Sequence, residues 1–75
     1  MEEFKDKIKE LSETEASVGL RVDALLELDR DNMDLGKGFT KESLTEARKR
    51  SKLIYKAIAK IDKETGALLL KAIDG

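Results

Sequence analysis

Mostly apolar residues recur at alternating steps of three and four along the second half of the chain. Nine positions form this series, here called the seam: Leu44, Ala47, Ser51, Ile54, Ile58, Ile61, Thr65, Leu68 and Ala72. This alternation is the a/d heptad spacing of a coiled coil, in which a helix packs along its length on another helix. The seam therefore predicts an amphipathic helix from Lys41 to about Ile73.

The residues around the seam indicate where this helix begins and where it is weakest. Thr40 is a good N-cap residue, and Phe39 and Leu44 have the spacing of a hydrophobic staple. Gly66 lowers helix propensity, so the chain could break there, but the seam keeps its phase through Thr65 and favours a continuous or kinked helix.

The first half of the chain has a similar series of apolar residues within residues 2–29. The series consists of Phe4, Ile8, Leu11, Val18, Val22 and Leu25. Glu15 occupies its one missing position, Ser12 to Glu15 has the form of a capping box, and Gly19 costs about 1 kcal/mol against alanine inside a helix. The unbroken phase nevertheless predicts one helix over 2–29.

Residues 30–39 form the predicted connection, because they contain Asp, Asn and two Gly. A calcium-binding loop starting at Asp31 would put Met33 and Leu35 where oxygen ligands are required, so we reject calcium binding. A connection of this length sets residue i opposite roughly residue 71 − i and places Glu15 near Tyr55 and Lys56.

These elements predict a single all-α domain over residues 1–75. Its architecture would be an antiparallel helical hairpin of two long amphipathic helices. Because one hairpin leaves many apolar side chains uncovered, we expect two copies to pair into a dimeric four-helix bundle. The alternative is a monomer of three or four shorter helices, broken at 12–14 and at Gly66.

Charge is distributed unevenly along the chain, although the net charge is only −1. Residues 1–36 hold eleven acidic and five basic side chains, a net of −6, whereas residues 37–63 hold nine basic and three acidic, a net of +6. Two helices of opposite sign packed side by side would explain this. A basic surface that meets an anionic partner is the other explanation.

A basic stripe is predicted on the side of the second helix that faces away from the seam. The stripe consists of Lys41, Arg48, Lys52, Lys56, Lys60 and Lys63, and the candidate binding residues of this basic helix are Arg48, Lys49, Arg50, Lys52 and Lys56. Like charges at i,i+4 spacing cost a few tenths of a kcal/mol each, which is tolerable for a solvated face. The stripe therefore serves solubility alone, an acidic protein partner, or an anionic ligand such as nucleic acid or a phosphorylated small molecule.

The composition argues against several classes of function. The chain contains no cysteine and no histidine, which excludes Ser–His and Cys–His nucleophile pairs. We predict no enzyme activity, no metal and no cofactor. Nucleic acid is a less favoured partner because the whole chain is slightly acidic and has few aromatic residues. We expect no membrane association, a cytoplasmic location, and a homodimeric interaction or regulatory module.

Overall fold

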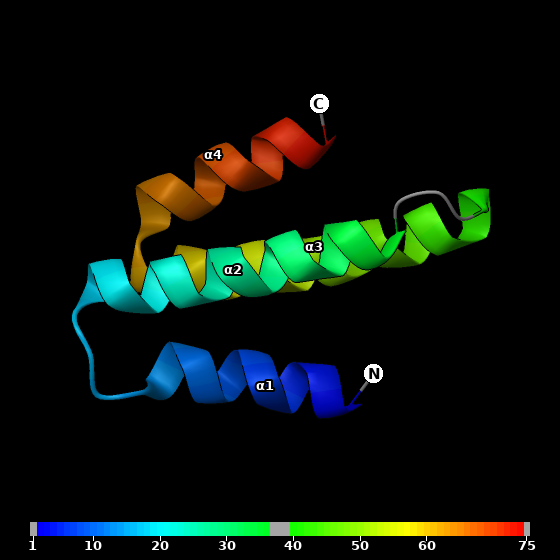
Figure 1. The fold of residues 1–75 in the computed structure, drawn as a ribbon. Helices are drawn as coiled ribbons and strands as arrows, with labels where there is room; N and C mark the ends of the chain where they lie inside the picture. The colour runs from blue at the N-terminus through cyan, green and yellow to red at the C-terminus, as the bar shows by residue number, and fades with distance from the viewer. Residues whose placement is uncertain (1, 37–39, 75) are drawn as a thin grey trace.

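The computed structural model describes residues 2–36 and 40–74, and within them the chain forms four helices (Figure 1). These are α1 (Glu2–Glu13), α2 (Val18–Gly36), α3 (Lys41–Ile61) and α4 (Lys63–Asp74). The described residues contain no strand, so the prediction of an all-α fold is confirmed. The expected pair of long helices is wrong in helix number, and the alternative of four shorter helices agrees with the structure.

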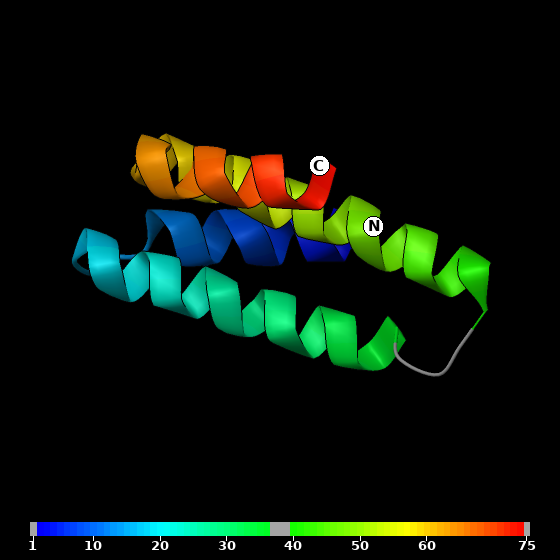
Figure 2. The same ribbon diagram turned by 90° about the horizontal axis from the view of Figure 1, so that it is seen from above.

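Each helix runs antiparallel to the one before it, so α1 and α3 run in the same direction (Figures 1 and 2). α1 packs against both α2 and α3, while α4 packs against α3 alone among the described helices. α1 and α4 lie on opposite sides of the α2–α3 pair (Figure 1). The molecule is therefore a three-helix unit with a fourth helix on one side of α3.

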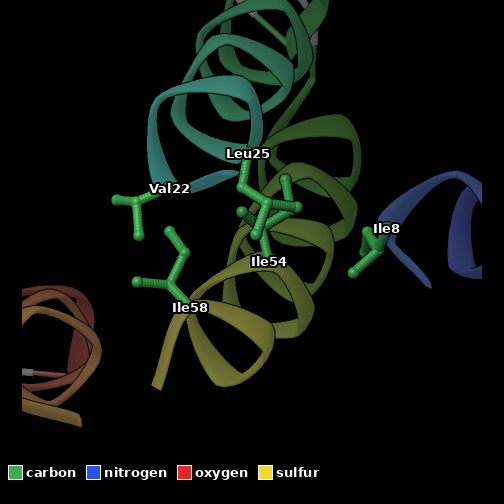
Figure 3. Close-up of a cluster of buried hydrophobic side chains, with 5 residues drawn as sticks. All are labelled: Ile8, Val22, Leu25, Ile54 and Ile58. Carbon is green, nitrogen blue, oxygen red and sulfur yellow. The ribbon is translucent and has the colours of Figure 1, made fainter. Parts of the chain in front are cut away.

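The core lies where α1, α2 and α3 meet. It consists of the buried side chains Ile8, Val22, Leu25, Ile54 and Ile58 (Figure 3). Ala47 and Ser51 are also buried, so the central part of the predicted seam does face the interior. The predicted N-cap is also confirmed, because Thr40 Oγ1 accepts a hydrogen bond from the Ser43 backbone N–H at 3.2 Å.

The single helix predicted over 2–29 is wrong, since the chain leaves the helical path between Glu13 and Val18. α2 is capped at its N-terminus by Ser17, whose side-chain oxygen accepts a hydrogen bond from the Leu20 backbone N–H at 3.3 Å. Ser12 does not restart the helix, because its hydroxyl donates back to the Lys9 carbonyl. The turn allows α1 to fold back, so that Ile8 enters the core from a separate helix.

The continuous helix predicted over 41–73 is also wrong. α3 ends at Ile61, with Asp62 as its C-cap, and the break does not lie at Gly66. Asp62 serves two helices. Its backbone N–H donates to the Ile58 carbonyl at the end of α3, and its carboxylate accepts from the Thr65 N–H and hydroxyl at the start of α4. The seam therefore stops facing the core after Ile61.

Gly66 has a different role from the predicted weak point in a long helix. It is buried where α4 crosses α3, and a Cβ atom added there would lie 2.3 Å from Ala59 Cα. Leu68, which the seam placed in an interface, is instead 70% exposed. The glycine thus permits the close approach of the two helices.

The register between α2 and α3 also differs from the prediction. α2 continues to Gly36, so the connection is much shorter than residues 30–39. Asn32 therefore lies opposite Ala47, with its Nδ2 donating to the Ala47 carbonyl at 2.8 Å. Glu15 is exposed in the turn between α1 and α2, so its predicted position on a packed seam opposite Tyr55 is wrong. The predicted staple residue Phe39 lies outside the described residues.

Candidate binding groove

A groove of about 710 Å³ runs between α1 and α3. We call it the basic groove. Its lining is contributed by α1, by α3 and by one residue of α2: Lys5, Ile8, Lys9, Ser12, Glu13, Arg21, Leu53, Lys56, Ala57, Lys60 and Ile61.

The apolar part of the lining is aliphatic. Leu53, Ala57 and Ile61 follow one another at successive turns of α3, and Ile8 contributes from α1. All four belong to the main core cluster or pack against it. The floor of the groove is therefore the outer surface of the core, held by the same contacts that hold the fold.

Five cations and one carboxylate surround this floor. Lys5 and Lys9 lie one turn apart on α1, Lys56 and Lys60 lie one turn apart on α3, and Arg21 comes from α2. Glu13 is the single acidic residue of the lining. The groove therefore carries a net positive charge of about four, which favours an anionic occupant.

None of the five groove cations forms an ion pair with a carboxylate of the described residues. The ion pairs found there join Lys49 to Glu46 and Lys52 to Asp74, and both lie outside the groove. An isolated cation on a surface is ordinary, but five around one apolar floor repel one another. A bound anion would relieve that repulsion.

Arg21 joins the groove to the end of α1. Its Nη1 atom donates to the Ser12 carbonyl at 3.1 Å, in the last turn of α1. The C-terminal end of a helix carries partial negative charge, which stabilises a guanidinium there. The Nε atom of Arg21 is buried and has no hydrogen-bond partner among the described residues.

The five candidate binding residues do not all line the same hollow. Lys56 lines the basic groove, whereas Arg48 lines a smaller hollow of about 330 Å³ between α3 and α4. Lys49 and Lys52 form the ion pairs given above, and Arg50 is half-buried. The stripe is divided because α1 and α4 flank α3 on opposite sides.

Four groove cations were absent from the predicted set: Lys5, Lys9, Arg21 and Lys60. Lys60 was part of the predicted basic stripe, at i,i+4 spacing from Lys56, but was not among the candidate binding residues. Lys5 and Lys9 have the same spacing, but they lie in a half of the chain whose net charge is −6. Because that half is acidic overall, Lys5 and Lys9 were not predicted as binding residues.

A hydrogen-bonded polar network lies between α2 and α3. The Asp29 carboxylate accepts from the Ser51 hydroxyl and from the Tyr55 hydroxyl, the latter at 2.6 Å. The Asn32 amide donates to Ser51 Oγ and to the Ala47 carbonyl. Such a network fixes the relative position of two helices, because any shift would leave buried polar groups without partners.

The pKa of Tyr55 is raised by its burial and by its contacts in this network. Desolvation by burial, and then the hydrogen bond to the Asp29 carboxylate and its negative charge, raise the pKa of Tyr55 to about 12. The hydroxyl therefore stays protonated at neutral pH and donates to Asp29. This arrangement suits a structural contact and not an acid or base near pH 7.

No group of three or more His, Cys, Asp or Glu side chains suited to a metal ion occurs among the described residues. Within residues 2–36 and 40–74, no helix combines the length and apolar character that crossing a membrane requires.

Comparison of the chain with protein-family models, with curated proteins and with solved structures finds no match.

Proposed function

We propose that the protein is a small non-catalytic interaction module that binds an acidic partner in the basic groove. The observation that supports this proposal is the set of five cations, unpaired by carboxylates of the described residues, around an aliphatic floor. A groove with both features suits a ligand that combines negative charge with apolar groups. An acidic protein surface has that combination.

Nucleic acid and phosphorylated small molecules remain the alternative class of ligand for the same cations. Proteins that bind single strands stack bases on aromatic side chains, and the groove lining contains none. The aliphatic floor would stay exposed beneath a phosphate backbone. These two features favour a protein partner.

We also propose that the module acts as a homodimer. The support is the exposure of large apolar side chains, since Leu20 is 63% exposed and Leu68 70% exposed, with Val18 and Leu44 also exposed. α4 has only α3 as a helix neighbour among the described helices, so one flank is open to a second copy. A dimeric bundle would cover such residues.

The groove proposal is tested by titrating a labelled glutamate- and leucine-rich peptide into the protein at two salt concentrations. The groove variant replaces four lysines by glutamine: Lys5, Lys9, Lys56 and Lys60. The matched control replaces four exposed lysines outside the groove: Lys7, Lys41, Lys63 and Lys71. Because both variants lose the same charge, any difference between them depends on position.

We expect the groove variant to bind on the order of tenfold more weakly, from roughly 0.2–1 kcal/mol per exposed charge pair. The control should change little, and higher salt should weaken binding to the parent protein. Equal losses in the two variants would contradict the groove. Labelled RNA is titrated in parallel, and tighter binding of RNA than of peptide would favour the alternative class.

A further inference from the structure

We infer that the basic groove recognises an acidic amphipathic helix of a partner protein, with its apolar stripe on the floor and an acidic row toward each rim. This inference rests on the proposed function and specifies its ligand. The arrangement of charges, the shape of the floor and the dimensions of the groove each support it.

The cations form two rows that run along the groove. Lys5 and Lys9 make the row on α1, and Lys56 and Lys60 make the row on α3. α1 and α3 run in the same direction, so the two rows are roughly parallel (Figures 1 and 2). Within each row the spacing is one helical turn, about 6 Å. Acidic residues at i,i+4 spacing on a partner helix have the same spacing.

An extended segment does not match this pattern. Successive side chains of a strand point to opposite faces, so a strand offers only one row of side chains to a groove. A helix presents an apolar stripe with a flanking row on each side, because its residues are about 100° apart around the axis. Two charged rims around an apolar floor require three rows.

The floor has a place for one apolar side chain of that helix. Ala57 is the smallest residue among the α3 members of the floor, and it lies between Leu53 and Ile61. It is half-buried and lines the groove beside two larger neighbours. A leucine or isoleucine from the partner would fit over Ala57, as a knob enters a hole between facing helices.

The length of the groove sets the length of the ligand. On α1 its lining extends from Lys5 to Glu13, and on α3 from Leu53 to Ile61. Each stretch rises about 12 Å, at 1.5 Å per residue. The bound part of the partner is therefore between two and three helical turns, within a longer helix that is stable enough to form.

Arg21 closes the floor where α1 ends. Its hydrogen bond to the Ser12 carbonyl places the guanidinium beside the apolar residues of the lining. A carboxylate of the partner would accept a charge-assisted hydrogen bond there. The expected ligand thus has acidic residues on both flanks and one near its end.

The experiment compares three labelled acidic peptides by fluorescence anisotropy. The first has leucines at i,i+4 spacing flanked by glutamates, the second has the same residues in an order that gives no apolar face, and the third is polyglutamate. The inference predicts that the first binds at least about tenfold tighter than the other two. Equal binding of all three would overturn it while leaving the proposed function intact. Binding of none would overturn both.

A second measurement tests the floor independently of charge. Ala57→Met fills the space over which the partner side chain would lie, and Ala67→Met adds the same group on an exposed part of α4. Ala57→Met should weaken the amphipathic peptide by about tenfold and leave polyglutamate unchanged, with circular dichroism reporting that both variants fold. Unchanged binding of the amphipathic peptide by a folded Ala57→Met variant would overturn the inference.

Discussion

Replacing Gly66 by alanine tests whether α4 packs as closely on α3 as the structure has it. A Cβ atom at residue 66 would lie 2.3 Å from Ala59 Cα and 2.4 Å from Ala59 N and Cβ. Favourable contacts between carbon atoms are at about 3.5–4.0 Å, so the overlap exceeds roughly 1 Å. The atoms involved include backbone, which a change of side-chain rotamer cannot move, so α4 must shift outward.

Two opposing effects determine the magnitude. Alanine is favoured over glycine in a helix by about 1 kcal/mol, whereas forcing extra atoms into a close contact costs typically about 1–3 kcal/mol. A backbone overlap of this size belongs at the upper end of that range. We therefore expect Gly66→Ala to lower the free energy of unfolding by about 1–2 kcal/mol. In a domain of this length, such a loss lowers Tm by roughly 5–15 °C.

Gly19 provides the matched control, because it also lies in the first turn of a helix and a Cβ atom there would meet nothing within 4 Å. Gly19→Ala should raise Tm by a few degrees, from about 0.4–1 kcal/mol of reduced unfolded-state entropy. Thermal unfolding followed by circular dichroism measures both variants. A rise in Tm for Gly66→Ala similar to that for Gly19→Ala would refute the close contact of α4 with α3.

Three further predictions concern the polar network, the core and the dimer. The chain has one tyrosine, so its alkaline absorbance titration reports Tyr55 alone, and Asp29→Asn should bring the midpoint from about 12 toward 10. Because the pKa of Tyr55 is raised on folding, the contribution of its hydroxyl to stability is full below about pH 10 and is lost between about pH 10 and 12. A free energy of unfolding that stays constant across this range would contradict the raised pKa of Tyr55. Ile58→Ala removes a fully buried side chain and should cost about 2–5 kcal/mol in denaturant unfolding; a loss under about 1 kcal/mol would contradict its place in the core. Light scattering should give twice the 8.4 kDa chain mass for the parent and the single mass for the Leu20→Glu/Leu68→Glu variant; a parent that is monomeric at micromolar concentration would contradict the dimer.

The helix that forms α3 was predictable because its signals are local. Thr40 caps its first turn, and Ala47, Ile54 and Ile58 share one face at helical spacing. Those residues are buried as their spacing predicts. The start and the inner face of α3 therefore follow from the sequence.

The two breaks were not predictable from the apolar pattern, because the pattern continues through them. Phe4 and Ile8 keep the phase of Val22 and Leu25, yet they reach the core from a separate helix. At the second break, Asp62 supplies both caps, but a single aspartate between charged neighbours is a weak signal. The contact of Gly66 with α3 is a tertiary effect that no local spacing reveals.

The register was missed for a related reason. Asp, Asn and Gly in residues 30–36 are typical of a turn, but this stretch is helical. Asn32 is buried and donates to α3, and Asp29 accepts from Ser51 and Tyr55. These long-range hydrogen bonds stabilise the helical conformation against local preference. Because the connection lies later in the chain and is shorter than predicted, each residue of α2 faces a different residue of α3 from the one predicted.

The basic groove was predictable only in part. Lys56 and Lys60 are on a visibly basic face of α3, so their exposure followed from the sequence. Lys5 and Lys9 join them only because the chain turns after Glu13 and brings α1 alongside α3. The basic groove depends on that turn, because its two sides come from α1 and α3, which are far apart in the sequence.

The most direct test of the groove is an NMR titration of the isotopically labelled protein with the amphipathic acidic peptide. If the groove binds it, the backbone amide signals of 5–13 and 53–61 should shift, together with the Nε–H signal of Arg21. The signals of 67–74 in α4, on the opposite side of α3, should stay in place (Figure 1). Shifts confined to α4, or no shifts at peptide concentrations well above those of the protein, would contradict binding in the groove.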